Sequence, residues 1–109
     1  MNQYSVKITD KALDDMEGIY NYIALDLQVP DTAMGQYNRI ADAIESLAYT
    51  PKRCRLFDSQ PERDMGMRQR LIDHYSIVFV VDDVASMVTV LRVLYSASDI
   101  NARLKNDQR

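Results

Sequence analysis

Cysteine and long apolar stretches are both scarce in this sequence. It has one cysteine, Cys54, which cannot form an internal disulfide or build a cysteine-based zinc site. No apolar run approaches the roughly 20 residues that a membrane-spanning helix needs. The first residues, MNQY, form neither a basic nor an apolar leader, so no export signal is expected. The sequence therefore predicts a cytoplasmic protein with no membrane partner, no metal and no cofactor.

A strongly basic balance is also lacking. The net charge of −3 is not that of a general nucleic-acid binder. The charge is uneven, because residues 1–50 carry 8 acidic and 3 basic side chains, whereas residues 51–70 carry 3 and 6. The basic segment is interpreted either as a solvated loop or as a contact patch for an acidic partner. The residues that would form such a patch are Lys52, Arg53, Arg55, Arg68 and Arg70.

What the sequence does have is enough apolar material for one core. Of its 109 residues 47% are hydrophobic and 27% are charged, which is typical of a soluble globular protein. A chain of this length forms one small domain, so we expect a single domain over residues 1–109 with a short polar tail from about residue 105.

The first half of the sequence predicts a strand and two helices. Residues 4–9 alternate and favour β-structure, and Thr9 or Asp10 can then cap a helix. Pro30 lies in the following break, either in the turn or at the first position of a second helix, which Thr50-Pro51 ends. Apolar residues at helical spacing give each helix one buried face: Leu13, Met16, Tyr20, Ile23 and Leu27, then Ala33, Tyr37, Ile40, Ile44 and Leu47.

The second half predicts a polar loop at about 52–65 and then three strands. Their expected ranges are Met67–Ile72, Tyr75–Val81 and Met87–Tyr95, and the short connections indicate an antiparallel meander. Asp99 can cap a final helix over Ile100–Lys105. The predicted fold class is α+β, in the order β-α-α-β-β-β, with the helical hairpin packed on one face of a small, mainly antiparallel sheet.

Several segments together resemble the RelE/ParE toxin superfamily, the toxin halves of bacterial type II toxin–antitoxin pairs. They are Tyr22-Ile23, LxxxP at Leu47–Pro51, YSIVFVVDD at Tyr75–Asp83 and VLRVLYSxxDI at Val90–Ile100. The resemblance covers roughly residues 4–104 and rests on the order and spacing of strand-like patterns. It implies either mRNA cleavage in the ribosome, as in RelE-like members, or poisoning of DNA gyrase, as in ParE-like members. Both kinds are silenced by an antitoxin.

The resemblance also implies where a nuclease site would lie. RelE-like nucleases carry an arginine just after the start of the middle strand, basic residues at the end of the last strand, and a tyrosine or histidine near the C-terminus. Here the middle-strand arginine corresponds to Ser76, and the basic residues of the last strand correspond to about Ser96 and Ser98. No tyrosine or histidine follows Tyr95. Strand alternation predicts that Ser76 faces the open side of the sheet. A serine cannot stabilise phosphorane charge as a guanidinium does, so a RelE-type site is not expected.

Other residues would have to serve a divergent nuclease. The candidates are Arg68, Arg70, His74, Arg92 and Tyr95. His74 is either a hairpin-turn residue or a proton carrier, and Tyr95 either packs in the core or donates a proton. Arg92 sits in an apolar strand, where it must either pair with an acid such as Asp99 or bind a partner.

The absence of the nuclease residues therefore favours a ParE-like toxin, of the kind also called plasmid stabilisation proteins, that acts by binding, and the resemblance implies that its target is DNA gyrase. The partner-binding candidates are Arg53, Arg55, Arg68, Arg70 and Arg92, and a cognate antitoxin is expected to form an oligomer with the toxin and neutralise it. The first alternative is a ribosome-dependent mRNA endonuclease with a divergent active site. The second is a non-toxic relative that only partners a DNA-binding antitoxin.

Overall fold

The computed structural model describes residues 3–58 and 60–95 and combines two α-helices with a five-stranded sheet. The elements, in chain order, are β1 (Ser5–Ile8), α1 (Asp10–Asn21), a π-helical turn (Tyr22–Asp26), α2 (Pro30–Ser46), a 3-10 turn (Pro51–Arg53), β2 (Arg55–Leu56), β3 (Arg68–Ile72), β4 (Tyr75–Asp82) and β5 (Met87–Tyr95). The predicted α+β class and the order of its main elements are confirmed. The short β2 lies inside the segment that was predicted to be loop.

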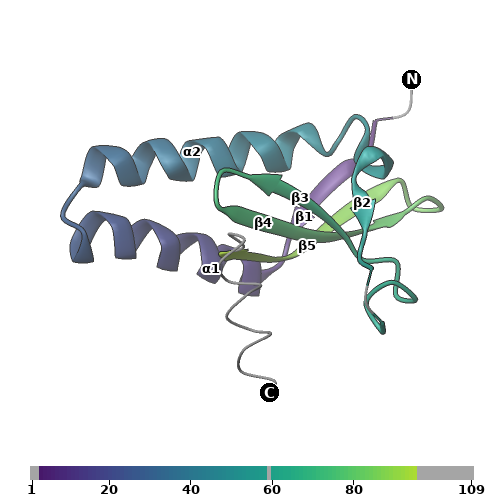
Figure 1. Ribbon diagram of the computed structural model, residues 1–109. Coiled ribbons are helices and arrows are strands. Elements are labelled where there is room, and N and C mark those ends of the chain that lie inside the picture. The colour runs from purple at the N-terminus through teal and green to yellow at the C-terminus, as the bar shows by residue number, and fades with distance from the viewer. Residues whose placement is uncertain (1–2, 59, 96–109) are drawn as a thin grey trace, which may run out of the picture.

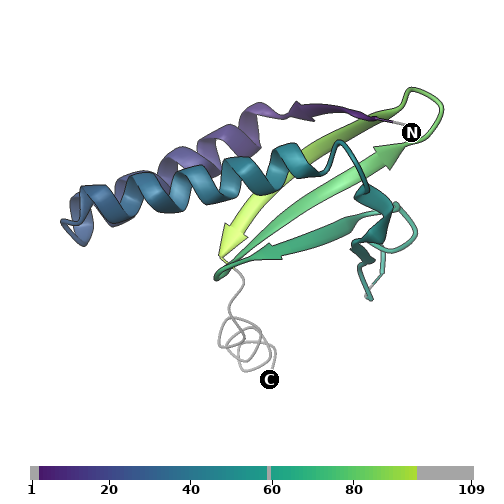
Figure 2. The ribbon, with the colours of Figure 1, turned by 90° about the horizontal axis from the view of Figure 1, so that it is seen from above.

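The sheet places the first strand of the sequence beside the last. Its order is β1-β5-β4-β3-β2, with β1 parallel to β5 and every other pair antiparallel (Figure 1). The predicted meander therefore forms through β3, β4 and β5. The two helices run side by side along the sheet and form a helical hairpin. The end of this hairpin at which the two helices are connected extends beyond the sheet (Figure 2).

Thr9 joins three elements at the start of α1. Its backbone N–H donates to the Val90 carbonyl at 3.1 Å, so it continues the pairing of β1 with β5. Its Oγ1 accepts the Ala12 N–H at 3.2 Å, which caps the helix as predicted, and donates to the Leu91 carbonyl at 3.1 Å. A single capping residue thus fixes the direction in which α1 leaves the sheet.

The buried face of the first helical segment differs from the predicted one. Ala12, Met16 and Ile23 are buried, whereas Leu13 and Leu27 are exposed. The buried stripe follows the spacing 12-16-23, so Leu13 falls beside it rather than on it. Leu27 caps the C-terminal end of the π-helical turn, in the connection to α2, and is 52% exposed.

The second helix and the core agree with the predicted pattern. Pro30 takes the first helical position, where its missing N–H leaves no hydrogen bond unmade. Ala33, Ile40, Ile44 and Leu47 are buried. Of these, Ile40, Ile44 and Leu47 belong to one core cluster with the sheet residues Ile77, Phe79, Val88, Val90 and Val93. The helix ends at Ser46, ahead of the Thr50-Pro51 stop that the sequence indicated.

A register shift in the meander changes which residues of β5 share a face. Val78 pairs with Arg92 but Phe79 pairs with Val90, so Leu91 is an extra residue in β5. As a result Val90 and Val93 both enter the core, and strict alternation, which would put Val90, Arg92 and Leu94 on one face, does not hold. A bulge of this kind leaves no clear signal in an apolar sequence.

Two further predictions concern the C-terminal segment and membrane-spanning helices. The proposed capping residue Asp99 and the helix over Ile100–Lys105 lie outside the described residues. Among the residues that the structure does describe, no helix is long and apolar enough to cross a membrane.

Candidate functional site

The position of the nuclease arginine holds a buried serine. Ile77 and Phe79 belong to the core cluster, so Ser76 of β4 faces the other side of the sheet as predicted, but it is only 4% exposed and not open to solvent. Its Oγ donates to Oε1 of Gln69 on β3 at 3.0 Å, which satisfies the hydroxyl within the sheet. Leu71 and Leu94 are its neighbours on the adjacent strands. Ser96 and Ser98, the other two nuclease-like positions, lie outside the described residues.

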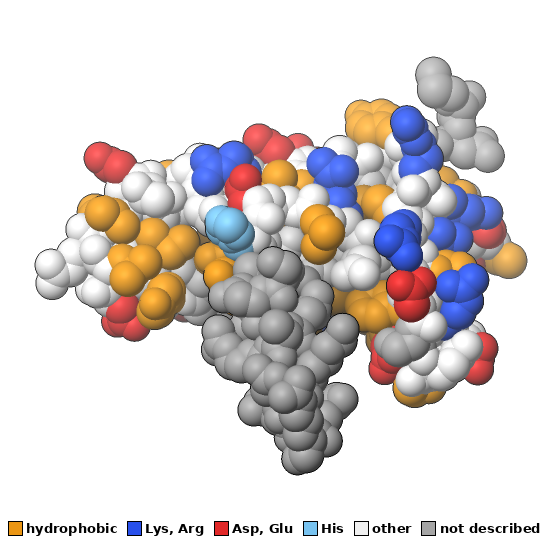
Figure 3. Space-filling view, in the orientation of Figure 1, with side chains coloured by type: hydrophobic (Ala, Val, Ile, Leu, Met, Phe, Trp, Pro, Cys, Tyr) orange, Lys and Arg blue, Asp and Glu red, His pale blue; other side chains and the backbone are white. Residues whose placement is uncertain are grey.

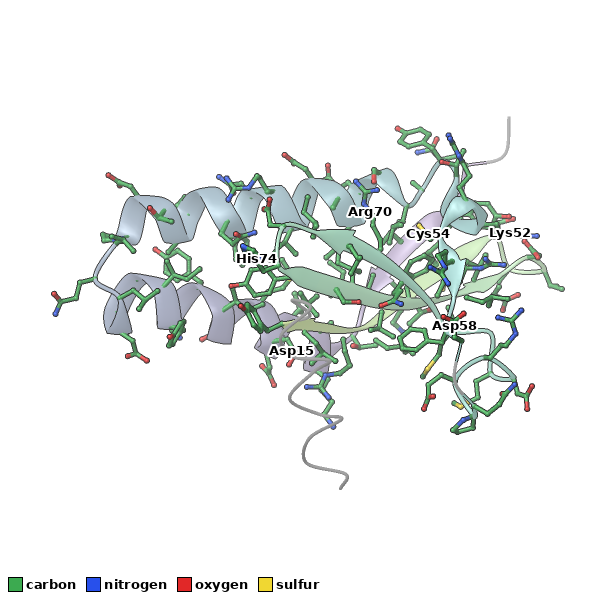
Figure 4. The ribbon with its side chains drawn as sticks, in the orientation of Figure 1. Asp15, Lys52, Cys54, Asp58, Arg70 and His74 are labelled. Atoms are coloured by element: carbon green, nitrogen blue, oxygen red, sulfur yellow. The ribbon has the colours of Figure 1, made fainter. Side chains whose placement is uncertain are left out.

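His74 and Tyr95 are brought together at one end of the sheet. Their ring centroids are 6.3 Å apart, and Tyr95 also meets Tyr75 edge-on at 5.6 Å. Burial raises the pKa of the Tyr75 phenol. Figure 4 shows His74 at the β3–β4 turn and Arg70 further along β3, against α2. Arg68 is at the far end of β3, about 13 Å from Ile72 at the usual rise per strand residue. The nuclease candidates therefore do not converge on one point.

The turn that carries His74 is tied to α2 by residues that sequence reasoning missed. Oδ2 of Asp73 accepts hydrogen bonds from Arg39 Nε at 2.8 Å and from Gln36 Nε2 at 3.0 Å. These bonds, the one from Arg39 first, hold the pKa of Asp73 below its usual value. Asp73 has a φ of 55°, a left-handed conformation that Asp tolerates in turns. Nothing in the sequence links residues this far apart.

Arg92, which is partly exposed, is paired with Asp15 of α1. Nε and Nη2 of Arg92 donate to the two carboxylate oxygens at 2.7 and 3.0 Å, and the Val93 N–H donates to Oδ2 at 3.0 Å. Burial tends to raise the pKa of Asp15, but the hydrogen bonds from Arg92 and Val93 outweigh it, so this pKa is lowered. Asp99, the acid that the sequence suggested as a partner, lies outside the described residues.

The basic segment does not form one uniform patch. Lys52 pairs with Asp83 at 2.7 Å, and Arg55 pairs with Asp58 at 3.1 Å. Nη1 of Arg68 donates to the Cys54 carbonyl at 2.7 Å and to the Lys52 carbonyl at 3.3 Å. Within the described residues, the remaining two side chains, Arg53 and Arg70, have neither an ion pair nor a hydrogen bond.

The surface divides into a hydrophobic end and a basic end. Figure 3 shows hydrophobic side chains gathered over the end of the helical hairpin, and Lys and Arg side chains gathered around β2 at the opposite end. Asp83, which binds Lys52, also accepts the Tyr4 hydroxyl at 2.8 Å, and these two hydrogen bonds lower its pKa, Lys52 contributing most. The basic end is thereby tied to the start of β1.

A groove of about 850 Å³ opens at the hydrophobic end, between the hairpin and the ends of β4 and β5. Its apolar and aromatic lining comprises Ile19, Tyr22, Ile23, Leu27, Val29, Tyr75, Val93, Leu94 and Tyr95. Leu27 is 52% exposed, and the sequence pattern had placed it in the core. An exposed apolar groove of this kind is typical of a surface that binds a partner segment.

No group of His, Cys, Asp and Glu among the described residues is arranged to hold a metal ion. The His74–Tyr95 contact, the buried Ser76, the apolar groove and the basic end are therefore the features on which a function can be built.

Comparison with known proteins identifies the family. The model of the ParE toxin of type II toxin–antitoxin systems matches residues 6–100, so the chain belongs to this toxin family. A search of curated proteins gives no match.

Solved structures agree on the fold. The chain is similar to one from the chromosomal ParDE toxin–antitoxin system of P. aeruginosa, with a TM-score of 0.70 and 22% identity over 88% of this chain and 99% of that one. It is also similar to a chain of the RelBE2 toxin–antitoxin complex of Mycobacterium tuberculosis, with a TM-score of 0.60 and 19% identity over 85% and 98%. A mutant of the E. coli toxin RelE in the free state gives a TM-score of 0.56 and 14% identity over 92% of each chain. At these identities the likeness establishes the shared fold.

Proposed function

We propose that this type II toxin inhibits DNA gyrase by binding it and has no nuclease activity. The observation that carries the proposal is Ser76, a buried and uncharged residue where a RelE-like nuclease would place an arginine. Gyrase as the target is the activity that the ParE-like branch of the superfamily implies. Sequence and fold together support the toxin class, and the site chemistry supports a binding mechanism.

The chemical argument concerns negative charge. When an RNA 2′-hydroxyl attacks the adjacent phosphate, the extra negative charge on the phosphate must be stabilised. A base must also take the proton of the 2′-hydroxyl, and an acid must protonate the leaving oxygen. Ser76 offers one hydroxyl, and Gln69 already accepts its hydrogen bond. Arg92 is paired with Asp15, and Arg68 is bound to backbone carbonyls away from His74. No described guanidinium among the candidates is therefore positioned beside the His74–Tyr95 pair.

A cognate antitoxin is proposed to occupy the apolar groove. Two of the similar structures belong to toxin–antitoxin assemblies, the ParDE system and the RelBE2 complex. The groove exposes Tyr22, Leu27 and Tyr95 beside the end of the helical hairpin. An amphipathic helix of a partner can bury its apolar face in a groove of this kind. The removal of that apolar surface from water drives the association. Neutralisation would follow because the toxin's binding surface is covered.

The mRNA endonuclease remains the second candidate function, and one observation favours it. His74 and Tyr95, a general base and a general acid in principle, meet at 6.3 Å between ring centroids. A nuclease that depends on them would lose its activity in a variant carrying His74→Gln and Tyr95→Phe.

A growth assay separates the two functions. We expect the Ser76→Ala, Ser96→Ala, Ser98→Ala variant to remain as toxic as the wild type, because small uncharged hydroxyls contribute little to a charged transition state. The His74→Gln, Tyr95→Phe variant should also remain toxic. Circular dichroism checks that both variants are folded. A folded serine variant that had become harmless would overturn the binding mechanism.

A further inference from the structure

A small polar pocket lies at the basic end, between the C-terminus of α2, the 3-10 turn and β3. Its volume is about 350 Å³, and its lining residues are Ser46, Leu47, Thr50, Arg53, Cys54 and Arg70. The lining, all of it among the described residues, includes two guanidinium groups and no carboxylate. Two fixed positive charges therefore share a pocket that holds no compensating negative charge.

Arg70 is the more constrained of the two arginines. It pairs across the sheet with the core residue Ile77, and its side chain extends toward the C-terminal half of α2 (Figure 4). Its Nε is shielded from solvent, and no hydrogen-bond acceptor reaches it from the described residues. A guanidinium stays charged at every physiological pH, so this donor cannot be relieved by losing a proton. Buried donors without acceptors are rare in folded proteins, and such a donor at a pocket points to a missing acceptor.

Arg53 adds a second charge from the 3-10 turn. It is exposed and has no acid partner in the described part of the chain, unlike Lys52 and Arg55. Burial raises the pKa of the Cys54 thiol, and the positive charges of Arg70, Arg68 and Arg53 oppose that rise. The three guanidinium groups therefore all lie near the same sulfur.

We propose that Arg53 and Arg70 form a receptor for one carboxylate of an acidic segment from a protein partner. A carboxylate supplies the acceptor that Arg70 lacks and binds guanidinium through two parallel hydrogen bonds. The Thr50 hydroxyl, also in the pocket lining, is a further donor. Nearby, β2 pairs with β3 only at Arg68 and Gln69, so residues 70–72 leave one strand edge open to an extended peptide.

The charge distribution favours an acidic protein segment over a nucleic acid. A row of phosphates needs a stripe of free basic side chains. Here Lys52, Arg55 and Arg68 already have partners within the chain, and the chain as a whole has a net charge of −3. Two free guanidinium groups in one pocket match a single acidic side chain. The inference does not depend on which target the toxin inhibits.

The test is an NMR titration of the isotope-labelled, full-length protein that follows its arginine Nε–H signals. The probe is a short acetylated peptide of alternating glycine and glutamate, and the matched control peptide has glutamine in place of glutamate. We expect the glutamate peptide to shift the Arg70 and Arg53 signals saturably, more weakly at high salt, and the glutamine peptide to shift neither. The Arg55 signal should move little, because Asp58 already pairs with Arg55.

Variants of single arginines test which side chains bind the peptide. Arg53→Gln, on the exposed turn, and Arg70→Gln should each weaken peptide binding by about tenfold, while the matched surface variant Arg55→Gln leaves it unchanged. If Arg70→Gln does not fold, Arg53→Gln and the wild-type titration still show whether the pocket binds a carboxylate. Equal shifts of all arginine signals, or no saturable shift, would overturn the receptor. So would a short single-stranded RNA that shifts Arg70 at lower concentrations than the peptide, since it would assign the pocket to nucleic acid.

Discussion

Arg92 of β5 and Asp15 of α1 form a two-point ion pair, and the same carboxylate accepts the N–H of Val93. The pair lies just past the point where β1 stops covering β5, since β1 pairs only as far as Val90. From there α1 takes over the edge of β5, with Thr9 bound to the Leu91 carbonyl and Asp15 to the Val93 amide. An acid on a helix thus continues the hydrogen bonding of a sheet.

Replacing Asp15 with alanine should destabilise the fold. The change removes three hydrogen bonds and leaves the Val93 amide, in a buried residue, without its acceptor. A loss of about 1–3 kcal/mol in the free energy of unfolding is expected. Urea denaturation followed by circular dichroism measures it. The matched control is Asp14→Ala, because Asp14 is exposed on the same helix; an equal loss in both variants would contradict the role given to Asp15.

The Asp15 pair should also make stability depend on pH. The folded-state pKa of Asp15 is lowered from its usual value of 3.8. An acid of this kind stabilises the fold fully above its unfolded pKa, and the contribution is lost as the pH falls through the folded pKa. The stability difference between the wild type and Asp15→Asn should therefore be constant near neutrality and shrink in acid, below about pH 4. Urea melts of both proteins across this range test it; a difference that grows in acid would contradict the sign.

The sequence predicted the fold well because its signals are local. The capping residue Thr9, the first-turn Pro30 and the helical spacing of Ala33, Ile40 and Ile44 each act within one element. The parts that were missed depend on distant residues. The two-residue strand β2 exists only because β3 lies beside it.

The candidate site was less predictable for the same reason. A resemblance placed Ser76 at the nuclease position, but its burial and its hydrogen bond to Gln69 arise from neighbouring strands. The basic segment was interpreted as a solvated loop or a contact patch, yet distant acids such as Asp83 pair with part of it and leave Arg53 and Arg70 without an acid partner in the described chain. Pairing between residues far apart in sequence has no signature in a single sequence.

Charge in the apolar groove should disrupt antitoxin binding. Leu27 lines the groove, so Leu27→Glu places a carboxylate where an apolar helix is expected to pack. We predict at least about tenfold weaker binding of the cognate antitoxin, measured by calorimetry. Leu25→Glu is the matched control, because Leu25 is 68% exposed in the π-helical turn just before Leu27 but does not line the groove. Equal weakening by both variants, or by neither, would place the antitoxin elsewhere.

The most direct test of the central claim is to assay one preparation of the purified toxin for two activities. One arm measures double-strand DNA cleavage by gyrase with the toxin present, and the other measures cutting of an mRNA in a translation extract. We predict toxin-dependent, gyrase-dependent DNA cleavage that the antitoxin abolishes, and an intact mRNA, because Ser76 is buried and uncharged where a nuclease needs a cation. Inactivity in both arms would indicate a non-toxic relative. Cut mRNA with no effect on gyrase would contradict the account.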